Sequence, residues 1–521
     1  GGVGFSEKPR ETKRRPAYCK SRVCSLADQD LLQGAAIHYI PEGIICMDKS
    51  KVYVAYNELG GKMTMHNNCM CNELYALKYR HLVDKGATLK VREWEELCRD
   101  TLKFYPDKLE PVTMQEVVSR YTGAKRRNYH EAMVQVKQRG LQDRHARVRM
   151  FVKNERFYDS DVLIKPPRAI QYRSMEFNLC LMKYTVPFEH HYYPTLTYGV
   201  VSGTRVIAKG LNWEERAELL LEKSRWFGKP IFYMIDYSSF DSTIQVPHLR
   251  TTHKKYLKCF GNAPYKILQK QIVNKGVTRH GIKYTVRGTR MSGDADTGLG
   301  NTLINCDAIY GVLKHSGIKR YDFLLDGDDA VIMVEQEMDT SKFADYGFIL
   351  KVSTTRDIHK VEFCQSRLVL RPKPLLVRNP MKIMSTTIVC KGLTNFRKWI
   401  AGMGACEYAC NRGVPLLEAY ASELRKTSRE IIQDRDTRMR MEMGVSAAAV
   451  TDMGRLTLWQ AWGIPPPIQV MLESSAYLKR LRSYLDIFTS DKQEDVEQLQ
   501  RQRTRYECSN ESGCSSWWNS G

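Results

Sequence analysis

The sequence predicts an α+β fold of two or three packed subdomains, on three observations. The 521 residues exceed what one compact core usually holds, and the hydrophobic fraction of 43% suits a globular chain. Apolar strands are expected at residues 231–236 and, as strand, tight turn and strand, at residues 321–335. Beyond residue 395, Trp, Leu and Ala recur at helical spacing.

The first half of the chain has weaker patterns. Residues 1–25 are basic and polar, which predicts an extended arm. Residues 26–115 alternate short apolar runs with Gly and Asn turns, so they predict no definite architecture. Residues 126–230 predict basic helices and strands punctuated by prolines, among them Pro187.

The middle of the chain has the clearest order. The strand at 231–236 is followed by a helical stretch over 247–274. A Gly-rich loop around Gly293 then leads into a helix over 297–315, which is expected to end near Gly317.

The charge of the chain indicates a polyanionic partner. Lysine and arginine number 80 against 58 acidic residues, a formal net charge of +22. Such an excess is typical of proteins that bind nucleic acid or an acidic membrane surface. A basic soluble protein without such a partner is the simpler alternative.

The cysteines indicate the redox compartment of the chain and whether it binds a metal, and the hydropathy pattern indicates whether it enters a membrane. The 15 cysteines are odd in number and scattered, which predicts reduced, intracellular thiols. His66-Asn-Asn-Cys69-Met-Cys71 has a loose metal-ligand pattern, but no second Cys/His pair lies at zinc-finger spacing, which favours buried thiols. No run of 18 apolar residues and no signal peptide is visible.

The strongest chemical signal is Leu325-Asp326-Gly327-Asp328-Asp329 between two apolar strands. Adjacent aspartates at a hairpin tip repel each other unless a cation binds them. Because turns favour Gly and Asp in any case, the motif alone is only suggestive.

A second carboxylate strand strengthens this signal. Asp236 ends the strand at 231–236, and Asp241 follows five residues later. Two strands that end in carboxylates can place Asp236 and Asp328 around a pair of Mg²⁺ ions, which prefer hard oxygen ligands. For Asp241 alone, a helix N-cap is the simpler interpretation.

The Gly-rich loop supplies a third polar element. Glycines that flank Ser292 allow the backbone to approach a template or a ribose closely. Thr297, Asn301 and Asn305 recur every four residues and therefore share one face of the expected helix.

A basic run interleaved with aromatic residues lies upstream. Alternating cations and rings suit a channel that handles phosphates, although a solvated pair of strands is the simpler alternative. The cations are Arg147, Arg149, Lys153, Arg156, Lys165, Arg168 and Arg173, and the aromatic residues are Phe151, Phe157, Tyr158 and Tyr172.

With these motifs in order, residues 115–475 resemble the RNA-dependent RNA polymerases of positive-strand RNA viruses, in the tombusvirus-like group. The segments that carry the resemblance are Tyr121-Thr-Gly-Ala-Lys-Arg-Arg-Asn-Tyr129, Lys153-Asn-Glu-Arg with Lys165-Pro-Pro-Arg168, Asp236-Tyr-Ser-Ser-Phe-Asp241, Ser292-Gly293 through Asn301, Gly327-Asp328-Asp329, Lys351, Glu362-Phe-Cys-Gln365, Gly413-Val-Pro415 and Ala461-Trp-Gly-Ile-Pro465. The sequence departs from the family at Gly298, where Ser is usual, and in the shorter loop before Arg168.

The resemblance implies a right hand of fingers, palm and thumb, with an antiparallel palm sheet and a helical thumb. The implied regions are an N-terminal arm and fingers-associated region at 1–114, fingers at 115–230, a palm at 231–394 with a fingers insertion at about 247–287, a thumb at 395–490 and a disordered tail at 491–521.

The resemblance also implies roles for individual residues. The implied catalytic residues are Asp236, Asp328, Asp329 and Lys351, and the three aspartates bind Mg²⁺, for which Mn²⁺ can substitute. The implied nucleotide-binding residues are Lys153, Arg168, Asp241, Ser292, Thr297 and Asn301. The implied RNA-binding residues are Lys125, Arg126, Arg127, Arg173 and Gly293.

The expected function is replication of a viral positive-strand RNA genome, with template RNA, nascent RNA and nucleoside triphosphates as ligands. A start at Gly1 rather than Met predicts a processed or downstream piece of a longer product. An upstream viral segment or auxiliary protein is expected to recruit it to membrane-bound complexes in the host cytoplasm. The alternatives are a non-catalytic RNA-binding viral protein and a reverse transcriptase. Asp241 argues against the latter, because reverse transcriptases usually carry an aromatic gate there.

Overall fold

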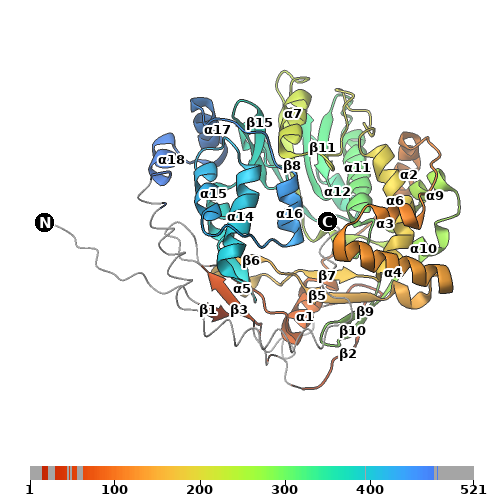
Figure 1. Ribbon diagram of the computed structural model, residues 1–521. Helices are drawn as coiled ribbons and strands as arrows, with labels where there is room; N and C mark the ends of the chain where they lie inside the picture. Colours follow the sequence, from red (N-terminus) through yellow and green to blue (C-terminus); the bar gives the residue numbers. More distant parts are fainter. Residues whose placement is uncertain are drawn as a thin grey trace.

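The computed structural model describes residues 14–20, 30–43, 46, 50–54, 63–392, 395–474 and 478. Helices and strands alternate along most of this length, which confirms the mixed fold class (Figure 1). The predicted tail at 491–521 lies outside the described residues.

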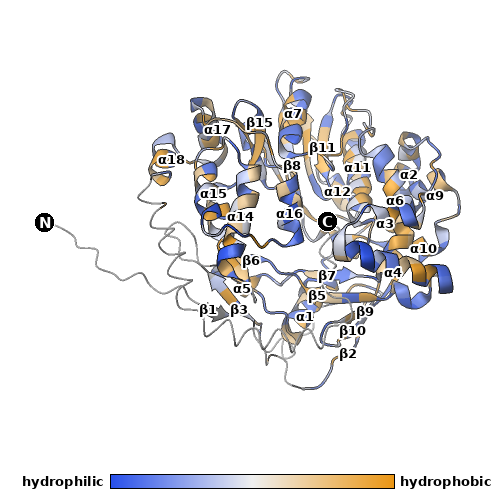
Figure 2. Cartoon of the chain, in the orientation of Figure 1, coloured by the Kyte–Doolittle hydropathy of each residue, from blue (hydrophilic) through white to orange (hydrophobic). Residues whose placement is uncertain are grey.

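A four-stranded antiparallel sheet lies at the centre of the molecule. Its strand order is β11 (Asp322–Asp326), β12 (Asp329–Val334), β8 (Ile231–Tyr237) and β13 (Leu350–Thr355). Both predicted strand regions are thereby confirmed. The sheet is apolar because its two faces pack on different cores, and β11 is accordingly coloured as hydrophobic in Figure 2.

Helices cover this sheet. On one face lies α11 (Thr297–His315), whose bounds agree with the predicted 297–315 and which ends before Gly317 at φ +68°. The same core includes residues of α2 (Val91–Thr101), α6 (Met175–Tyr192) and α9 (Val246–Phe260). The opposite face packs against α7 (Trp213–Ser224).

A second sheet joins segments that are far apart in the sequence. Its order is β2 (Ala36–Tyr39), β10 (Lys283–Arg287), β9 (Val273–Thr278), β5 (Val148–Val152) and β7 (Ala169–Tyr172). It lies below the central sheet in Figure 1, next to α1 (Met70–Ala76) and α4 (Gly123–Arg139). The remaining short elements are β4 (Met63–Met65), β6 (Arg156–Tyr158), α3 (Met114–Ser119), α5 (Asp159–Ile164), α8 (Phe240–Thr243) and α12 (Lys342–Asp345).

The C-terminal region is helical, as predicted. A hairpin of β14 (Ser366–Leu370) and β15 (Pro374–Arg378) precedes α13 (Pro380–Thr386) and the final helices. These are α14 (Phe396–Cys410), α15 (Leu417–Arg425), α16 (Arg435–Glu442), α17 (Asp452–Trp462) and α18 (Pro466–Leu472).

The described part of the predicted N-terminal arm belongs to a sheet. Strand β1 (Arg14–Pro16) pairs with β3 (Lys51–Val54), which also pairs with β16 (Val389–Lys391). Strand β3 therefore links the N-terminal segment to β16, more than 300 residues further along the chain, and this sheet shares a core with the C-terminal helices.

Two local predictions need correction. The helix expected over 247–274 is broken after α9 by Gly261, at φ +68°, and continues only as α10 (Tyr265–Gln269) before strand β9. Pro187 was expected to interrupt strands but lies inside α6. The Lys183 carbonyl, which a proline cannot pair, instead accepts a hydrogen bond from the Val112 N–H at 2.9 Å.

Among the described helices, none is long and apolar enough to cross a membrane.

Candidate active site

A cavity of about 1180 Å³ opens beside the central sheet. All the residues predicted to catalyse the reaction or bind the nucleotide line it. These are Asp236, Asp328, Asp329, Lys351, Lys153, Arg168, Asp241, Ser292, Thr297 and Asn301.

Strand register places charged residues in one row across the sheet. Asp326 pairs with Asp329 on β12, and Lys351 pairs with Asp236 on β8. The pairing of Ala330 with Ile235 puts Asp329 next to Asp236 one step further along. Opposed residues in antiparallel strands point to the same face, so three carboxylates and one ammonium group share this face.

Helix α11 fixes the hairpin turn that carries Asp328. Gly327 has φ +59° at the first position of the two-residue loop, a conformation that glycine adopts without strain. Its N–H donates to Thr302 Oγ1 and its carbonyl accepts from Asn305 Nδ2, both at 3.0 Å. Asn305 Oδ1 also accepts from the Tyr237 hydroxyl at 2.8 Å, so one amide joins β8, α11 and the turn.

The three aspartates of the hairpin differ in the charges that surround them. Asp326 pairs with Lys209 at 2.7 Å and Arg216 at 2.9 Å, and these cations hold its pKa below the usual range despite burial. Burial, followed by the charge of Asp241, raises the pKa of Asp328 to about 6. Burial, followed by the charge of Asp328, raises the pKa of Asp329 to about 7. The excess negative charge of such oxygen donors fits a divalent cation.

Asp241 and Asn301 form one hydrogen-bonded unit at the cavity wall. Asn301 Nδ2 donates to Asp241 Oδ1 at 2.8 Å, and Asn301 Oδ1 accepts from Arg290 Nε at 3.0 Å. Arg290 is only 2% exposed and lies against Gly300, where an added Cβ would come within 2.3 Å of its guanidinium. The backbone of α11 thus positions the amide through Arg290.

The Gly-rich loop brings two hydroxyl groups to the cavity. Ser292 Oγ accepts from the Gln171 N–H of β7 at 3.0 Å. Thr297 Oγ1 donates to the Met291 carbonyl at 2.5 Å, which fixes the start of α11. Both hydroxyl groups therefore have set positions.

Glu155 pairs with Lys153 and Arg168, two of the residues predicted to bind the nucleotide. Arg168 donates to it through Nε at 2.9 Å and through Nη2, and Lys153 lies 3.9 Å away. Lys153, Glu155 and Arg168 therefore form one charged cluster, of which Lys153 and Arg168 line the cavity.

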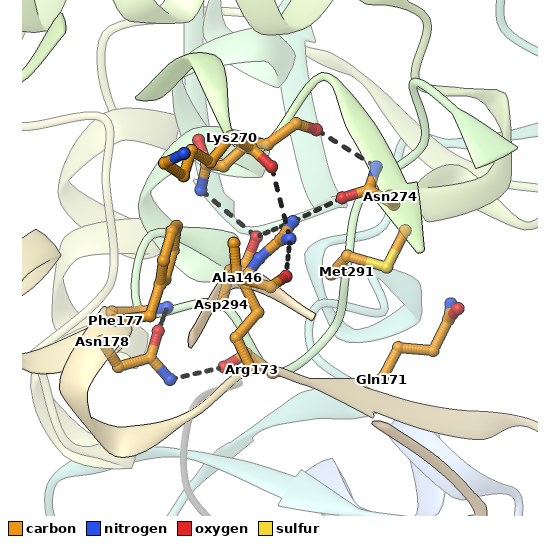
Figure 3. Close-up of polar contacts among 12 residues, drawn as sticks. Ala146, Gln171, Arg173, Phe177, Asn178, Lys270, Asn274, Met291 and Asp294 are labelled. Atoms are coloured by element: carbon orange, nitrogen blue, oxygen red, sulfur yellow. Dashed lines mark hydrogen bonds and ion pairs between the residues drawn. The ribbon is translucent and has the colours of Figure 1, made fainter. Parts of the chain in front are cut away.

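Arg173 does not have its predicted role as an RNA contact. Its side chain is 1% exposed and donates to Asp294 at 2.7 Å, Asn274 at 2.6 Å and the Ala146 carbonyl at 2.7 Å. Figure 3 shows the guanidinium enclosed by these acceptors. A group enclosed in this way cannot reach a nucleic acid, and it instead ties the Gly-rich loop to β7 and β9.

Gly293 is also needed for close packing within the chain. An added Cβ would lie 2.5 Å from the Cβ of Tyr172 and 2.8 Å from the Gln171 carbonyl. The close backbone approach predicted for this glycine is thus to strand β7 of the same chain, not to RNA.

One predicted RNA-binding residue of α4 lies at a second cavity of about 380 Å³. Lys125 lines it, with Nζ 4.5 Å from the centre of the Tyr121 ring, whereas Arg126 and Arg127 are exposed on the helix. Burial, and then the charge of Arg435, lowers the pKa of Lys125 to about 7. Lys209 and Gly298 line both cavities, so the two adjoin.

Comparisons with known proteins agree with this geometry. Residues 40–483 match a family described as viral RNA-dependent RNA polymerase. The chain belongs to this polymerase family.

Individual relatives of this family carry the name RNA-directed RNA polymerase. The chain is 28% identical to the protein of Tobacco necrosis virus (strain A), over 91% of this chain and 69% of that protein. It is 28% identical to that of Carnation mottle virus and 29% to that of Oat chlorotic stunt virus, over 70% of this chain in both cases. The chain spans about half the length of the latter two relatives, 50% and 53%. The predicted family is confirmed.

Several residues of this polymerase-family site were missed by the sequence analysis. Lys209, Arg216 and Glu155 pair with charged groups at the cavity, and Arg80 lines it. Glu155 lies inside the Lys153-Asn-Glu-Arg segment but was given no role there. Lys209, Arg216 and Arg80 lie in segments without a quoted motif, so only the fold reveals them. A basic residue within a strand-poor stretch gives no signal of its own.

Proposed function

We propose that this chain is the polymerising part of a viral replicase, and that it copies RNA by transferring nucleotides with two Mg²⁺ ions. One observation carries the proposal: the row of Asp329, Asp236 and Lys351 forms the floor of a cavity that the Asp241–Asn301 unit borders. When bound, the ions would activate a 3′-hydroxyl and stabilise the leaving pyrophosphate.

The residues of the chain would divide the remaining work. Asp236, Asp328 and Asp329 hold the cations, and Mn²⁺ is expected to substitute because it accepts the same oxygen ligands. Lys351, opposite Asp236 on β13, donates a proton to the leaving pyrophosphate. Lys153 and Arg168 bind the triphosphate, where the guanidinium offers a bidentate grip.

The Asp241–Asn301 unit favours an RNA product. Its carboxylate and amide, with Ser292 nearby, offer hydrogen bonds to a ribose 2′-hydroxyl. A reverse transcriptase would gain nothing from such groups, and a non-catalytic RNA-binding protein would have no use for paired carboxylates in a cavity.

The elements also suggest a right hand. We assign the central sheet and α11 to the palm, the second sheet with α4 to the fingers, and α14–α18 to the thumb. The second cavity, lined by Lys125, leads to the active site and would admit the template strand. We further propose that an upstream segment or auxiliary protein recruits the chain to membrane-bound complexes in the host cytoplasm.

The decisive experiment combines purified chain, an unprimed RNA template, labelled nucleotides and Mg²⁺. The wild type should make template-length RNA, and Asp236→Ala or Asp328→Ala should abolish synthesis while RNA binding persists. Glu110→Gln, at an exposed position away from the cavity, is the matched control. If both aspartate variants keep more than a few per cent of activity, the assignment is wrong.

A further inference from the structure

Four cysteines from three segments of the chain converge outside the active site. Cys19 follows β1, Cys46 lies between β2 and β3, and Cys69 and Cys71 lie at the start of α1. The Sγ atoms of Cys19 and Cys46 are 2.8 Å apart, those of Cys46 and Cys71 3.5 Å, and those of Cys69 and Cys19 3.6 Å.

The surrounding backbone holds these segments together. Asn72 is fully buried, and its Nδ2 donates to the carbonyls of Tyr18 at 2.9 Å and Asn67 at 2.7 Å. Its Oδ1 accepts from the Lys20 N–H at 2.9 Å. Asn67 Oδ1 in turn accepts from the Ser50 N–H at 3.1 Å. Two side-chain amides next to the thiols therefore hold the backbone at Tyr18, Lys20, Ser50 and Asn67.

The burial of the sulfur atoms and two of their three separations suit a tetrahedral metal site, whereas Cys19 and Cys46 lie closer together than zinc ligands do. With Zn–S bonds of about 2.3 Å, ligand sulfurs lie about 3.8 Å apart. Cys19, Cys69 and Cys71 are buried, at 9%, 3% and 8% exposure, and Cys46 is half-buried. Ligand atoms of Cys19, Cys46 and Cys69 all lie within 4.8 Å of one another.

The local charge also suits thiolates. Lys391 is adjacent on β16, and its ammonium group donates to the His66 carbonyl at 2.8 Å. This ammonium group would help to balance the negative charge of a thiolate cluster, because the two charges attract.

We propose that Cys19, Cys46, Cys69 and Cys71 bind one structural zinc ion through four thiolates. Zinc prefers such ligand sets where it stabilises a fold, and it displaces the thiol protons on binding. The ion would fasten the N-terminal segment and the β2–β3 loop to α1, which packs with β5 on one apolar core. The site would thus brace the second sheet, and this inference does not depend on the proposed catalytic activity.

His66, a ligand in the sequence pattern, lies beside this site. Its ring packs edge-on against Tyr18 and Phe157, with centroids 5.8 Å and 4.8 Å apart. Only Cys69 and Cys71 of the local pattern therefore belong to the cluster. Its other two members are Cys19, 50 residues before Cys69, and Cys46, 25 residues before Cys71.

The test is the metal content of the full chain, produced with zinc and purified under reducing conditions. Elemental analysis should find one zinc per chain, and each of Cys19→Ser, Cys46→Ser, Cys69→Ser and Cys71→Ser should lose it. Cys180→Ser, at another half-buried thiol, is the matched control and should retain zinc.

Because the variants could fail to fold, a second measurement uses the wild type alone. Replacing zinc by Co²⁺ should give the intense thiolate-to-cobalt charge-transfer absorption and the visible bands of tetrahedral coordination. Absence of zinc and of these bands in the wild type would overturn the proposal. So would stoichiometric zinc in any of the four variants, or a disulfide between Cys19 and Cys46 found by mass spectrometry of the protein as purified without reductant.

Discussion

At the scale of single residues, the aspartates of the hairpin are distinguished by their neighbours. Lys209 and Arg216 neutralise Asp326, whereas Asp328 and Asp329 face other carboxylates. Three aspartates within four positions therefore have different chemistry. The last two, with Asp236, are the carboxylates to which the proposed function assigns the cations.

The raised pKa of Asp329, about 7, predicts a pH dependence of stability in the metal-free protein. An unfolded aspartate has a pKa of about 3.9, so the folded state holds more protons between about pH 4 and pH 7. Stability should therefore fall as the pH rises through this window, and Mg²⁺ should restore it at the upper end.

Thermal melting in EDTA checks this prediction. Asp329→Asn should melt at a higher temperature than the wild type at pH 8 and with a weaker pH dependence, while Glu110→Gln should follow the wild type. Equal pH profiles for Asp329→Asn and wild type would show that Asp329 is already ionised and compensated.

The Asp241–Asn301 hydrogen bond predicts how the sugar is selected. Asn301→Ala removes the amide that holds the Asp241 carboxylate at 2.8 Å, so the 2′-hydroxyl loses both partners. Sites built to bind a hydroxyl lose several kcal/mol of discrimination when its partners are removed. The preference for ribonucleotides over deoxynucleotides should fall by about tenfold or more.

Competition assays with paired nucleotides measure this preference, with Mn²⁺ if activity in Mg²⁺ is weak. Asn262→Ala, the same substitution at an exposed asparagine, should leave it unchanged. An unaltered ratio in Asn301→Ala would mean that sugar selection lies elsewhere.

At the scale of elements, helix α11 organises the site from one side. Thr297 and Asn301 line the cavity and Asn305 holds the hairpin turn, as the four-residue spacing predicted. Gly300 lies between Thr297 and Asn301, and because it has no side chain it leaves space for the Arg290 guanidinium. The helix therefore positions both the hairpin turn that carries Asp328 and the Asp241–Asn301 unit.

Gly300→Ala tests this role. The new Cβ would come within 2.3 to 2.9 Å of three guanidinium atoms of Arg290, which is buried and cannot swing into solvent. Overpacking of this kind costs about 1–3 kcal/mol. We expect a lower melting temperature together with weaker ribose discrimination, because Arg290 positions Asn301.

The control is Gly228→Ala, where the nearest atom to the new Cβ is a Glu335 oxygen at 3.8 Å. Loss of stability without loss of discrimination in Gly300→Ala would indicate that Asn301 is held without Arg290.

At the scale of the whole molecule, the excess of positive charge is distributed among sites with different tasks. Arg173 is used internally, Lys153 and Arg168 lie at the active-site cavity, and Lys125 lies in the adjoining one. The net charge of +22 therefore indicates a polyanionic partner but not which cations contact it.

The lowered pKa of Lys125, about 7, predicts that template binding depends on pH. A phosphate beside this lysine favours its charged form, so binding takes up a proton above pH 7. Affinity for single-stranded RNA should therefore fall between pH 6 and pH 8. Lys125→Arg, which stays charged throughout, should weaken this dependence.

Fluorescence anisotropy with a labelled RNA at constant ionic strength measures how the RNA affinity of the wild type and of Lys125→Arg changes with pH. Identical slopes for wild type and Lys125→Arg would place the template away from this cavity.

Local patterns in the sequence were sufficient to predict the strand at 231–236, the hairpin at 321–335, the helix at 297–315 and the carboxylates among them. Each depends on neighbours within a few residues, where hydrophobic periodicity and turn chemistry act. The family resemblance supplied the remaining site residues, and the cavity gathers all those assigned to catalysis and the nucleotide.

Tertiary structure alone decided how the charges are paired. Whether an arginine such as Arg173 meets RNA or a buried aspartate depends on which distant segment lies against it, and the sequence carries no local signal of that contact. The same holds for Lys209 beside Asp326 and for the hydrogen bond to the Lys183 carbonyl, which makes Pro187 tolerable in a helix. It also holds for the four cysteines, the first and last of which, Cys19 and Cys71, lie 52 residues apart. Burial and pairing are properties of the packed chain, because they depend on contacts between residues that only folding brings together.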